Sequence, residues 1–307
     1  MKIKKTALTM VFLTLVLAEV LVQLSGVLDF PVYKADNQIG YIPAPGQSGK
    51  FLNSREWEFN AYSMNAGTFK PDGSRFNVLL VGDSIVLGGN PLAQSERLGP
   101  QLEKFTDWQV WPVSAGSWAL QNEFSYLRSH QEILDRIDAV TFVWNSGDFE
   151  GPSSWASELT HPLKRPFPGL LYVARKYGFA SVQPPQVRAE LQVRPRDWGA
   201  DLHDFSRTFK RPIFIFMYPN LDELEHPAKM NDQLDSRIPD LQARLNKNAN
   251  ISRVADSLNW NSGRYRDGMH PDSQGNSALA KIIVSGMCKK KVEKMTCTGF
   301  DEALMSQ

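Results

Sequence analysis

The sequence predicts an α/β fold with a mainly parallel sheet, because buried-strand patterns alternate with helical ones. Short continuous apolar runs are typical of parallel strands that are covered on both faces. Four such runs occur, at 77–81, 108–113, 138–144 and 212–218. Apolar residues at helical spacing lie between or after them, at 98–105, 119–131, 238–248 and 273–287. This order implies right-handed βαβ units, with a ligand site at the carboxyl ends of the strands.

The remaining segments are assigned mainly from composition. Residues 29–75 are rich in Pro, Gly, Asn and Tyr and are predicted to form a juxtamembrane, N-terminal extension. Residues 150–210 contain many Pro, Arg and Trp residues and one helical patch at about 170–177, which predicts an insertion within a domain spanning 76–287. Residues 85–90 favour a short helix or loop, and 251–258 a strand or helix. Residues 288–307 form the C-terminal tail.

Composition and charge exclude several classes of function. Hydrophobic residues make up 42% of the 307-residue chain and charged residues 22%, which is typical of a folded globular protein. The net charge of +1 gives no basic excess for a nucleic-acid partner. The sequence also lacks the His-x-His, HExxH, paired CxxC and phosphate-loop motifs. We therefore expect neither a metal nor a cofactor.

Residues 1–28 form a targeting segment. A basic start, Met1–Lys5, precedes an apolar stretch of about 23 residues, which as a helix rises roughly 35 Å and spans a bilayer core of about 30 Å. Glu19 counts against a membrane span, and Val16-Leu17-Ala18 offers a signal-peptidase site. The chain nevertheless stays apolar after that site. We expect an uncleaved anchor in a bacterial inner membrane with the globular part in the periplasm or outside; secretion after cleavage is the alternative.

The two cysteines suit an exported protein. Cys288 and Cys297 flank a basic segment near the C-terminus. In an oxidising compartment they would close a short loop as a structural disulfide. Two free thiols are the alternative.

Two motifs far apart in the chain predict nucleophilic catalysis. Gly82-Asp83-Ser84-Ile85 follows the first apolar strand, and Asp267-Gly268-Met269-His270-Pro271 lies nearly two hundred residues later. A serine hydroxyl is a weak nucleophile at neutral pH and needs a base within hydrogen-bond reach. His270 can serve as that base, and Asp267 can orient it and stabilise the imidazolium. The other histidines (His130, His161, His203 and His226) lack a comparable context and are interpreted as structural or surface residues.

These motifs resemble those of the SGNH (GDSL-type) hydrolase and acyltransferase family. The likeness covers about 76–287, with the 150–210 segment outside it. Gly82–Ile85 resembles the family's first conserved block, and Ala115-Gly116-Ser117 resembles its second. Residues 267–271, with the Gly275-Asn276 that follows, resemble its last block. The resemblance implies a flavodoxin-like, three-layer α/β/α fold. It also implies the catalytic residues Ser84, His270 and Asp267, with the backbone N–H groups of Ser84 and Gly116 in the oxyanion hole.

The family's third block departs from its usual form. The family has Gly-x-Asn-Asp, whereas this chain has Asn145-Ser146-Gly147-Asp148. Side chains two residues apart on an extended segment point to the same side, so Asn145 could still donate its amide to the oxyanion. Alternatively, Asn145 braces the turn and the hole has two backbone donors. Asp83 and Asp148 are expected to brace turns as well.

The expected function is that of an exported, membrane-anchored serine esterase. Its substrate would be O-acyl groups, chiefly O-acetyl, on a cell-envelope polysaccharide or exopolysaccharide, because the insertion is rich in aromatic residues (Trp155, Tyr172, Tyr177 and Trp198). One alternative is an O-acetyltransferase that works with a multi-pass membrane protein as acyl donor. A lipid esterase or thioesterase is another. A fourth is a non-catalytic polysaccharide-binding or assembly protein, favoured by the altered third block.

Overall fold

Five parallel strands form the central sheet of the computed structural model, which describes residues 2–178, 186–290, 292 and 294–297. In sheet order they are β6 (Gln109–Ser114), β5 (Asn77–Gly82), β7 (Ala139–Trp144), β8 (Ile213–Met217) and β9 (Ala249–Arg253). Every pair of neighbours is parallel, and β5 lies between β6 and β7. The chain therefore reverses its direction of travel across the sheet beside β5. A ligand site is expected at the carboxyl ends of the strands at this switch point.

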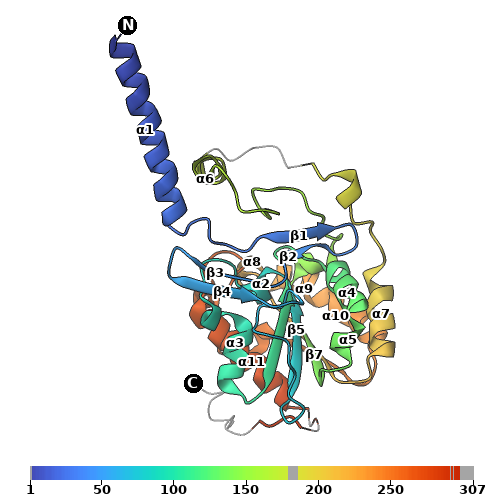
Figure 1. Cartoon of the computed structure of the whole chain (residues 1–307). Helices are drawn as coiled ribbons and strands as arrows, with labels where there is room; N and C mark the ends of the chain where they lie inside the picture. Colours follow the sequence, from blue (N-terminus) through green and yellow to red (C-terminus); the bar gives the residue numbers. More distant parts are fainter. Residues whose placement is uncertain (1, 179–185, 291, 293, 298–307) are drawn as a thin grey trace.

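Helices cover both faces of the sheet, as Figure 1 shows. One apolar cluster joins the sheet to α3 (Leu98–Phe105) and α11 (Ser273–Cys288). A second joins the opposite face to α4 (Leu120–Ser129), α7 (Trp198–Thr208) and α10 (Ile238–Arg244). Shorter helices complete the layers: α2 (Ser84–Leu87), α5 (Gln131–Leu134), α8 (Leu221–Glu225) and α9 (Pro227–Gln233). The prediction of a three-layer α/β/α fold with a mainly parallel sheet is confirmed.

The N-terminal extension contains two antiparallel hairpins, which composition did not predict. They are β1 (Tyr33–Asp36) with β2 (Gly40–Pro43), and β3 (Gln47–Phe51) with β4 (Arg55–Phe59). The first hairpin is tied to the loop after β6, where Tyr41 donates its hydroxyl to Gly116 O at 2.6 Å and Trp118 Nε1 donates to Tyr41 O. The extension thus reaches the carboxyl edge of the sheet.

The 150–210 segment lies over the same edge. It includes α6 (Gly169–Val173) and is bound to the N-terminal hairpin, for example through Tyr33 N donating to Pro162 O at 2.8 Å. The N-terminal helix α1 (Lys2–Leu24) projects from this side of the molecule, with α6 nearby (Figure 1). Lys5–Leu24 is long and apolar enough to cross a membrane, a property that signal sequences share.

Candidate functional site

Ser84 is presented at the carboxyl end of β5 by a turn that only a glycine can make. A Cβ on Gly82 would lie 2.6 Å from Val86 Cγ2 and 3.1 Å from Val143 O, so the strand can turn into α2 only with a glycine there. The Asp83 carboxylate caps α2 by accepting Ile85 N–H at 2.9 Å. Ser84 is the first residue of that helix and is partly exposed beside the sheet edge.

His270 and Asp267 reach Ser84 from the loop before α11. His270 Nε2 lies 2.9 Å from Ser84 Oγ, and its Nδ1 lies 3.0 Å from both carboxylate oxygens of Asp267. An ionised Asp267 accepts the Nδ1 proton, which leaves the Nε2 lone pair facing the serine hydroxyl. The structure brings together the three residues that the two sequence motifs single out.

The loop holds Asp267 in its ionised form. Burial alone would raise the pKa of this carboxyl, but the backbone N–H groups of His270 and Met269 donate to it and lower the pKa below its ordinary value. The His270 ring lowers it further. Tyr218 fixes the loop from β8 by donating its hydroxyl to Met269 O at 2.8 Å. The acid that orients His270 therefore stays charged at neutral pH.

Asn145 does not offer its amide to the space beside Ser84. Its Nδ2 donates to Asp83 Oδ2 at 3.1 Å and to Asp148 Oδ2 at 3.0 Å, and the side chain is buried. Both amide hydrogens are used, and Asn145 Oδ1 accepts Gly147 N–H. This geometry corresponds to the bracing alternative rather than to an oxyanion donor.

Asp83, Asp148 and nearby Glu123 form a buried acidic group beneath the site. Burial raises the pKa of Asp83, against the lowering influence of the Ile85 N–H, His270 and the Ser84 N–H. Burial, together with the charges of Asp83 and Glu123, raises the pKa of Asp148 well above its ordinary value. The Ser84 hydroxyl lies 3.4 Å from Asp83 Oδ2, so the candidate nucleophile is in contact with this acidic group.

Gly116 lies beside Ser84, on the loop that follows β6. A Cβ added to Gly116 would lie 4.0 Å from Ser84 Cβ and 3.8 Å from His161 Nε2. Ser117 after it has φ 60°, in the left-handed region that few non-glycine residues adopt. Two hydrogen bonds hold this turn: the Tyr41 hydroxyl donates to Gly116 O, and the Ser153 hydroxyl donates to Ser117 O. Gly116 therefore leaves an open space about the size of a methyl group between Ser84 and His161.

His161 is the residue that the sequence interpretation missed. Its ring packs against Tyr41 with centroids 4.0 Å apart and edge-on to Tyr33 at 4.8 Å. Burial lowers its pKa to about 4, so the imidazole is neutral at pH 7. Nδ1 lies 3.1 Å from Thr160 Oγ1, while Nε2 has no hydrogen-bond partner among the described residues. No local motif marks His161, because rings from the N-terminal hairpin set its position.

The aromatic residues of the insertion do not form an exposed sugar-binding face. Trp155 is 4% exposed and Tyr172 is 7% exposed, and Trp198 packs edge-on against Phe149. Only Tyr177 of the four, at 65%, is largely exposed. The aromatic content of 150–210 therefore reflects packing, and it gives no support to a polysaccharide substrate.

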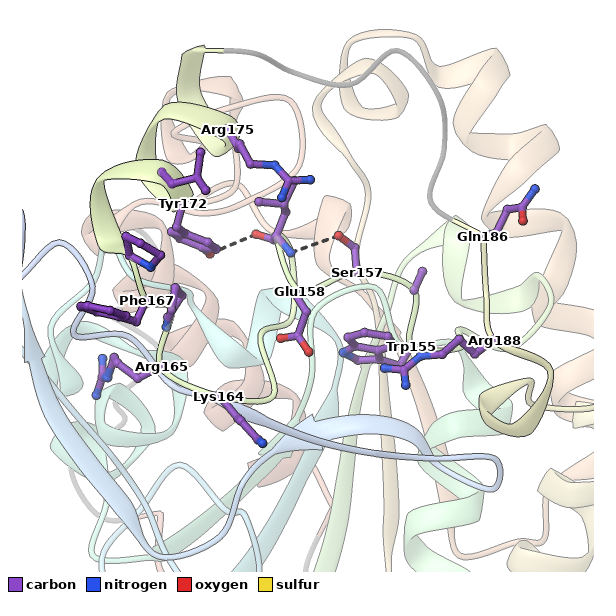
Figure 2. Close-up of a pocket in the computed structure, with 15 residues that line it drawn as sticks. Trp155, Ser157, Glu158, Lys164, Arg165, Phe167, Tyr172, Arg175, Gln186 and Arg188 are labelled. Carbon is purple, nitrogen blue, oxygen red and sulfur yellow. Dashed lines mark hydrogen bonds between the residues drawn. The ribbon is translucent and has the colours of Figure 1, made fainter. Parts of the chain in front are cut away.

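A cavity of about 730 Å³ lies within the insertion (Figure 2). Its walls come from α6 and the preceding chain on one side, and from the Trp155–Leu159 turn with Gln186 and Arg188 on the other. Arg188 stacks over the Trp155 ring at 4.6 Å. The catalytic candidates do not line this cavity; the turn that ends at His161 lies between it and Gly116.

Cys288 and Cys297 form a disulfide with a Cα–Cα distance of 6.0 Å. The bond joins the end of α11 to the tail, where Thr296 O accepts Trp108 Nε1 at 3.1 Å. In the part of the chain that the structure describes, no three His, Cys, Asp or Glu side chains are arranged to hold a metal ion.

Comparison with known proteins gives structural but not sequence matches. No protein-family model and no curated protein matches the chain. Solved structures with a similar arrangement include a protein described as a GDSL-like lipase from Bacteroides ovatus, with 13% identity and a TM-score of 0.39 over 70% of this chain and 53% of that one. The esterase EstA from Pseudoalteromonas has 13% identity and a TM-score of 0.39 over 69% of this chain and 97% of its own.

A third structure is the acetyl xylan esterase Est2A from the rumen bacterium Butyrivibrio proteoclasticus. It has 13% identity and a TM-score of 0.38, over 70% of this chain and 64% of that protein. The match spans about half of the Bacteroides ovatus protein and slightly less than two thirds of Est2A. Likeness at this level concerns the general arrangement of the chain, and it says nothing about this chain's substrate.

Proposed function

We propose that this protein is a membrane-anchored serine esterase that removes O-acyl groups, chiefly O-acetyl, from a cell-envelope polysaccharide or exopolysaccharide. One observation carries the proposal: Ser84 Oγ, both ring nitrogens of His270 and the Asp267 carboxylate form a continuous chain of contacts of 2.9 and 3.0 Å. That arrangement activates a hydroxyl for attack on an acyl carbon. The apolar Lys5–Leu24 stretch supports the anchor.

The reaction proceeds through an acyl-serine intermediate. Ser84 Oγ attacks the ester carbonyl carbon and gives its proton to His270 Nε2, while the oxyanion accepts the N–H groups of Ser84 and Gly116. The tetrahedral intermediate collapses, the bond to the sugar oxygen breaks, and His270 returns the proton to that oxygen. Water, deprotonated by His270, then attacks the acyl carbon; the bond from that carbon to Ser84 Oγ breaks, His270 returns the proton to Oγ, and the carboxylic acid is released.

The surroundings of Ser84 support a small acyl group on a large carrier. A Cβ placed on Gly116 would meet Ser84 Cβ and His161 Nε2 at about 4 Å, so the space beside Ser84 accepts at least a methyl group such as that of acetyl. The side chains of His270 and Asp267 are 28% and 50% exposed, so the base lies at the molecular surface. A polymer that projects an acetyl group can approach such a site without entering a tunnel.

Acyl transfer is a second candidate, favoured by the position of the site on the side of the molecule that bears α1 (Figure 1). The same acyl-Ser84 would be attacked by a sugar hydroxyl instead of water. A multi-pass membrane protein would supply the acyl group, because a single helix such as α1 cannot carry acyl groups across a bilayer. The chemistry at Ser84, His270 and Asp267 is common to both candidates.

The test is turnover of p-nitrophenyl acetate and of longer p-nitrophenyl esters by the full-length protein in detergent. We expect Ser84→Ala and His270→Ala to lower acetate turnover by a thousandfold or more, because the residues act as a unit. Ser74→Ala and His203→Ala, at exposed positions outside the site, are matched controls that should leave turnover unchanged.

Labelling by a serine-directed phosphonate separates the remaining outcomes. Labelling that disappears in Ser84→Ala supports a reactive serine, and preference for acetate over longer esters supports the small acyl group. Turnover that persists in Ser84→Ala, or neither turnover nor labelling in the parent protein, would count against an esterase and favour a binding or assembly role.

A further inference from the structure

A charged residue in the apolar helix α1 accepts hydrogen bonds from the insertion. The Glu19 carboxylate accepts Gly169 N–H and Leu170 N–H at the start of α6, each at 2.8 Å. Gln23 on the next turn of α1 also donates to Glu19, at 2.7 Å. Gly169 packs closely against this helix, since a Cβ there would lie 3.1 Å from Val22 Cγ1. These contacts hold α6 against the last two turns of α1.

The level of this contact along α1 places α6 at the edge of a bilayer. Glu19 precedes the last residue of α1, Leu24, by five positions, which is about 7 Å along the helix axis. If Lys5–Leu24 crosses a hydrocarbon core of about 30 Å, all of it is needed, and Glu19 lies roughly 7 Å inside the boundary. The start of α6, bound to Glu19, then lies at the same depth.

The wall of the cavity that is formed by α6 and the chain before it has the composition of a membrane interface. Phe167 is 82% exposed and Leu171 is 55% exposed, which is unfavourable for such side chains in water. Lys164 and Arg175 line the same cavity, Lys164 before α6 and Arg175 after it (Figure 2), and neither has an ion-pair partner among the described residues. We call Lys164, Phe167, Leu171 and Arg175 the α6 surface.

We propose that the α6 surface is a second membrane contact, which inserts Phe167 and Leu171 at the boundary between the headgroups and the acyl chains and binds anionic phospholipid through Lys164 and Arg175. Apolar side chains flanked by cations are the pattern of interfacial helices, and lysine and arginine near a membrane surface attract anionic lipids. Arg165 beside them is neutralised by Asp29 at 3.0 Å and takes no part. This inference rests on the membrane anchor of the proposed function.

Lipid contact at α6 also fixes the direction in which the site faces. The insertion connects α6 to His161, and His161 lies over Gly116 beside Ser84. With α1 and α6 both at the membrane, the carboxyl edge of the sheet faces the bilayer. The acyl-bearing substrate would therefore be met close to the membrane surface.

The test uses full-length protein in nanodiscs with a nitroxide on one introduced cysteine. The two native cysteines are joined in a disulfide, so they do not compete for the label. The label goes to Leu13→Cys in the middle of α1, to Leu171→Cys, or to Gly73→Cys, where an added Cβ meets open space before β5. Collisions with oxygen, which concentrates in lipid, are compared with collisions with a water-soluble nickel chelate.

We expect the oxygen-to-nickel ratio at Leu171→Cys to be at least threefold higher than at Gly73→Cys and lower than at Leu13→Cys. Lys164→Glu with Arg175→Glu should lower the ratio at 171 in discs that contain phosphatidylglycerol but not in pure phosphatidylcholine discs. The matched control, Lys164→Arg with Arg175→Lys, should leave the ratio unchanged.

Three results would overturn the inference. A water-exposed label at 171 with a lipid-exposed label at 13 refutes the α6 contact and leaves the anchor intact. Water exposure at both positions refutes the anchor as well. Equal ratios for the charge-reversed and charge-conserving pairs in anionic discs refute the lipid-binding role of the two cations. Turnover of p-nitrophenyl acetate by the same samples reports on Ser84 independently of all three.

Discussion

Several hydrogen-bond donors near Ser84 are already bound to neighbouring side chains. Asp83 takes the Ile85 N–H and one amide hydrogen of Asn145, so that Asn145 braces the turn instead of facing the substrate. Besides the Ser84 and Gly116 N–H groups, His161 Nε2 borders the open space at Gly116, 3.8 Å from where a Cβ on that glycine would lie. The Thr160 hydroxyl lies 3.1 Å from His161 Nδ1 and 3.3 Å from Ser157 O, an arrangement compatible with either ring tautomer; in the tautomer with its proton on Nε2, that N–H faces the open space. His161 is then positioned to donate to the acyl oxygen.

Replacing His161 tests this assignment. We expect His161→Phe to keep the ring stacked on Tyr41 and Tyr33 but to lower kcat for p-nitrophenyl acetate by tenfold or more, with a smaller change in KM, because loss of one oxyanion donor typically costs about 10²–10³ in rate. His161→Gln retains a donor and should recover part of the rate. Equal kcat values for the parent and His161→Phe, with unchanged melting temperature, would show a purely structural ring.

The sequence identifies the residues of this site that belong to local motifs and not the others. Asp267 and His270 are three residues apart on one loop, so their pairing follows from spacing alone, and Ser84 follows a strand whose apolar pattern is clear. His161 reaches the site from a segment without periodicity, through contacts with Tyr33 and Tyr41 more than a hundred residues earlier. For Asn145, the sequence suggested a donor role that the structure does not show. Strand geometry alone does not reveal the two buried carboxylates that bind its amide.

At the scale of single elements, α11 closes the fold and is tied at its end to the tail. Its apolar face packs against α3 and the sheet, and the disulfide from Cys288 to Cys297 follows directly. Within the disulfide loop, Thr296 binds Trp108 and Asp107, which directly precede β6. The disulfide therefore keeps the end of the described chain on the edge strand of the sheet.

Removal of this disulfide should lower stability but not abolish folding. Closing a loop of about ten residues stabilises a protein by roughly 2–3 kcal/mol through chain entropy. We expect Cys288→Ser with Cys297→Ser to lower the melting temperature by several degrees, and dithiothreitol to have a similar effect on the parent protein. Scanning calorimetry measures both. No difference between the oxidised parent and the double variant would mean that the tail does not contribute to stability.

Elements with strong periodicity could be predicted, and those held by tertiary contacts could not. The strands β5 to β8 are almost wholly buried, and their apolar runs mark them clearly. The strands β3 and β4 alternate between partly buried and exposed residues and include Gly49, which packs against the Trp57 ring. Such short strands carry little signal of their own, because pairing within the hairpin and against the body determines them.

For the whole molecule, the buried acidic group makes stability depend on pH. Glu123 in α4 is fully buried, accepts Trp144 Nε1 at 2.7 Å, and has one carboxylate oxygen without a partner among the described residues. Burial raises its pKa from about 4.5 to about 8. Between these values the folded protein binds more protons than the unfolded chain, so stability is lost as pH rises through this window.

The window from pH 6.5 to 8 separates the buried acidic group from His161. His161, whose lowered pKa of about 4 makes stability rise with pH, has an ordinary value of 6.5 and contributes little above it. We expect the free energy of unfolding to fall between pH 6.5 and 8 by up to about 1.4 kcal/mol per pH unit. Glu123→Gln, which still accepts the Trp144 N–H, should reduce that slope in urea titrations. An unchanged slope would mean that a group other than Glu123 causes the dependence of the unfolding free energy on pH.

The contact between the N-terminal hairpin and the insertion sets an order of events during synthesis. Tyr33 and Tyr41 are made early, but their partners Pro162 and His161 follow about 120–130 residues later. At roughly 5–20 residues per second, this delay is on the order of ten seconds. For that time, Tyr33 and Tyr41 can pack against each other, with centroids 6.1 Å apart in the finished fold, but lack the His161 ring. His161 thus joins the surroundings of the serine only after residue 161 has been made, so a nascent chain that stalls before residue 160 carries Ser84 and Gly116 without the ring that lies over them.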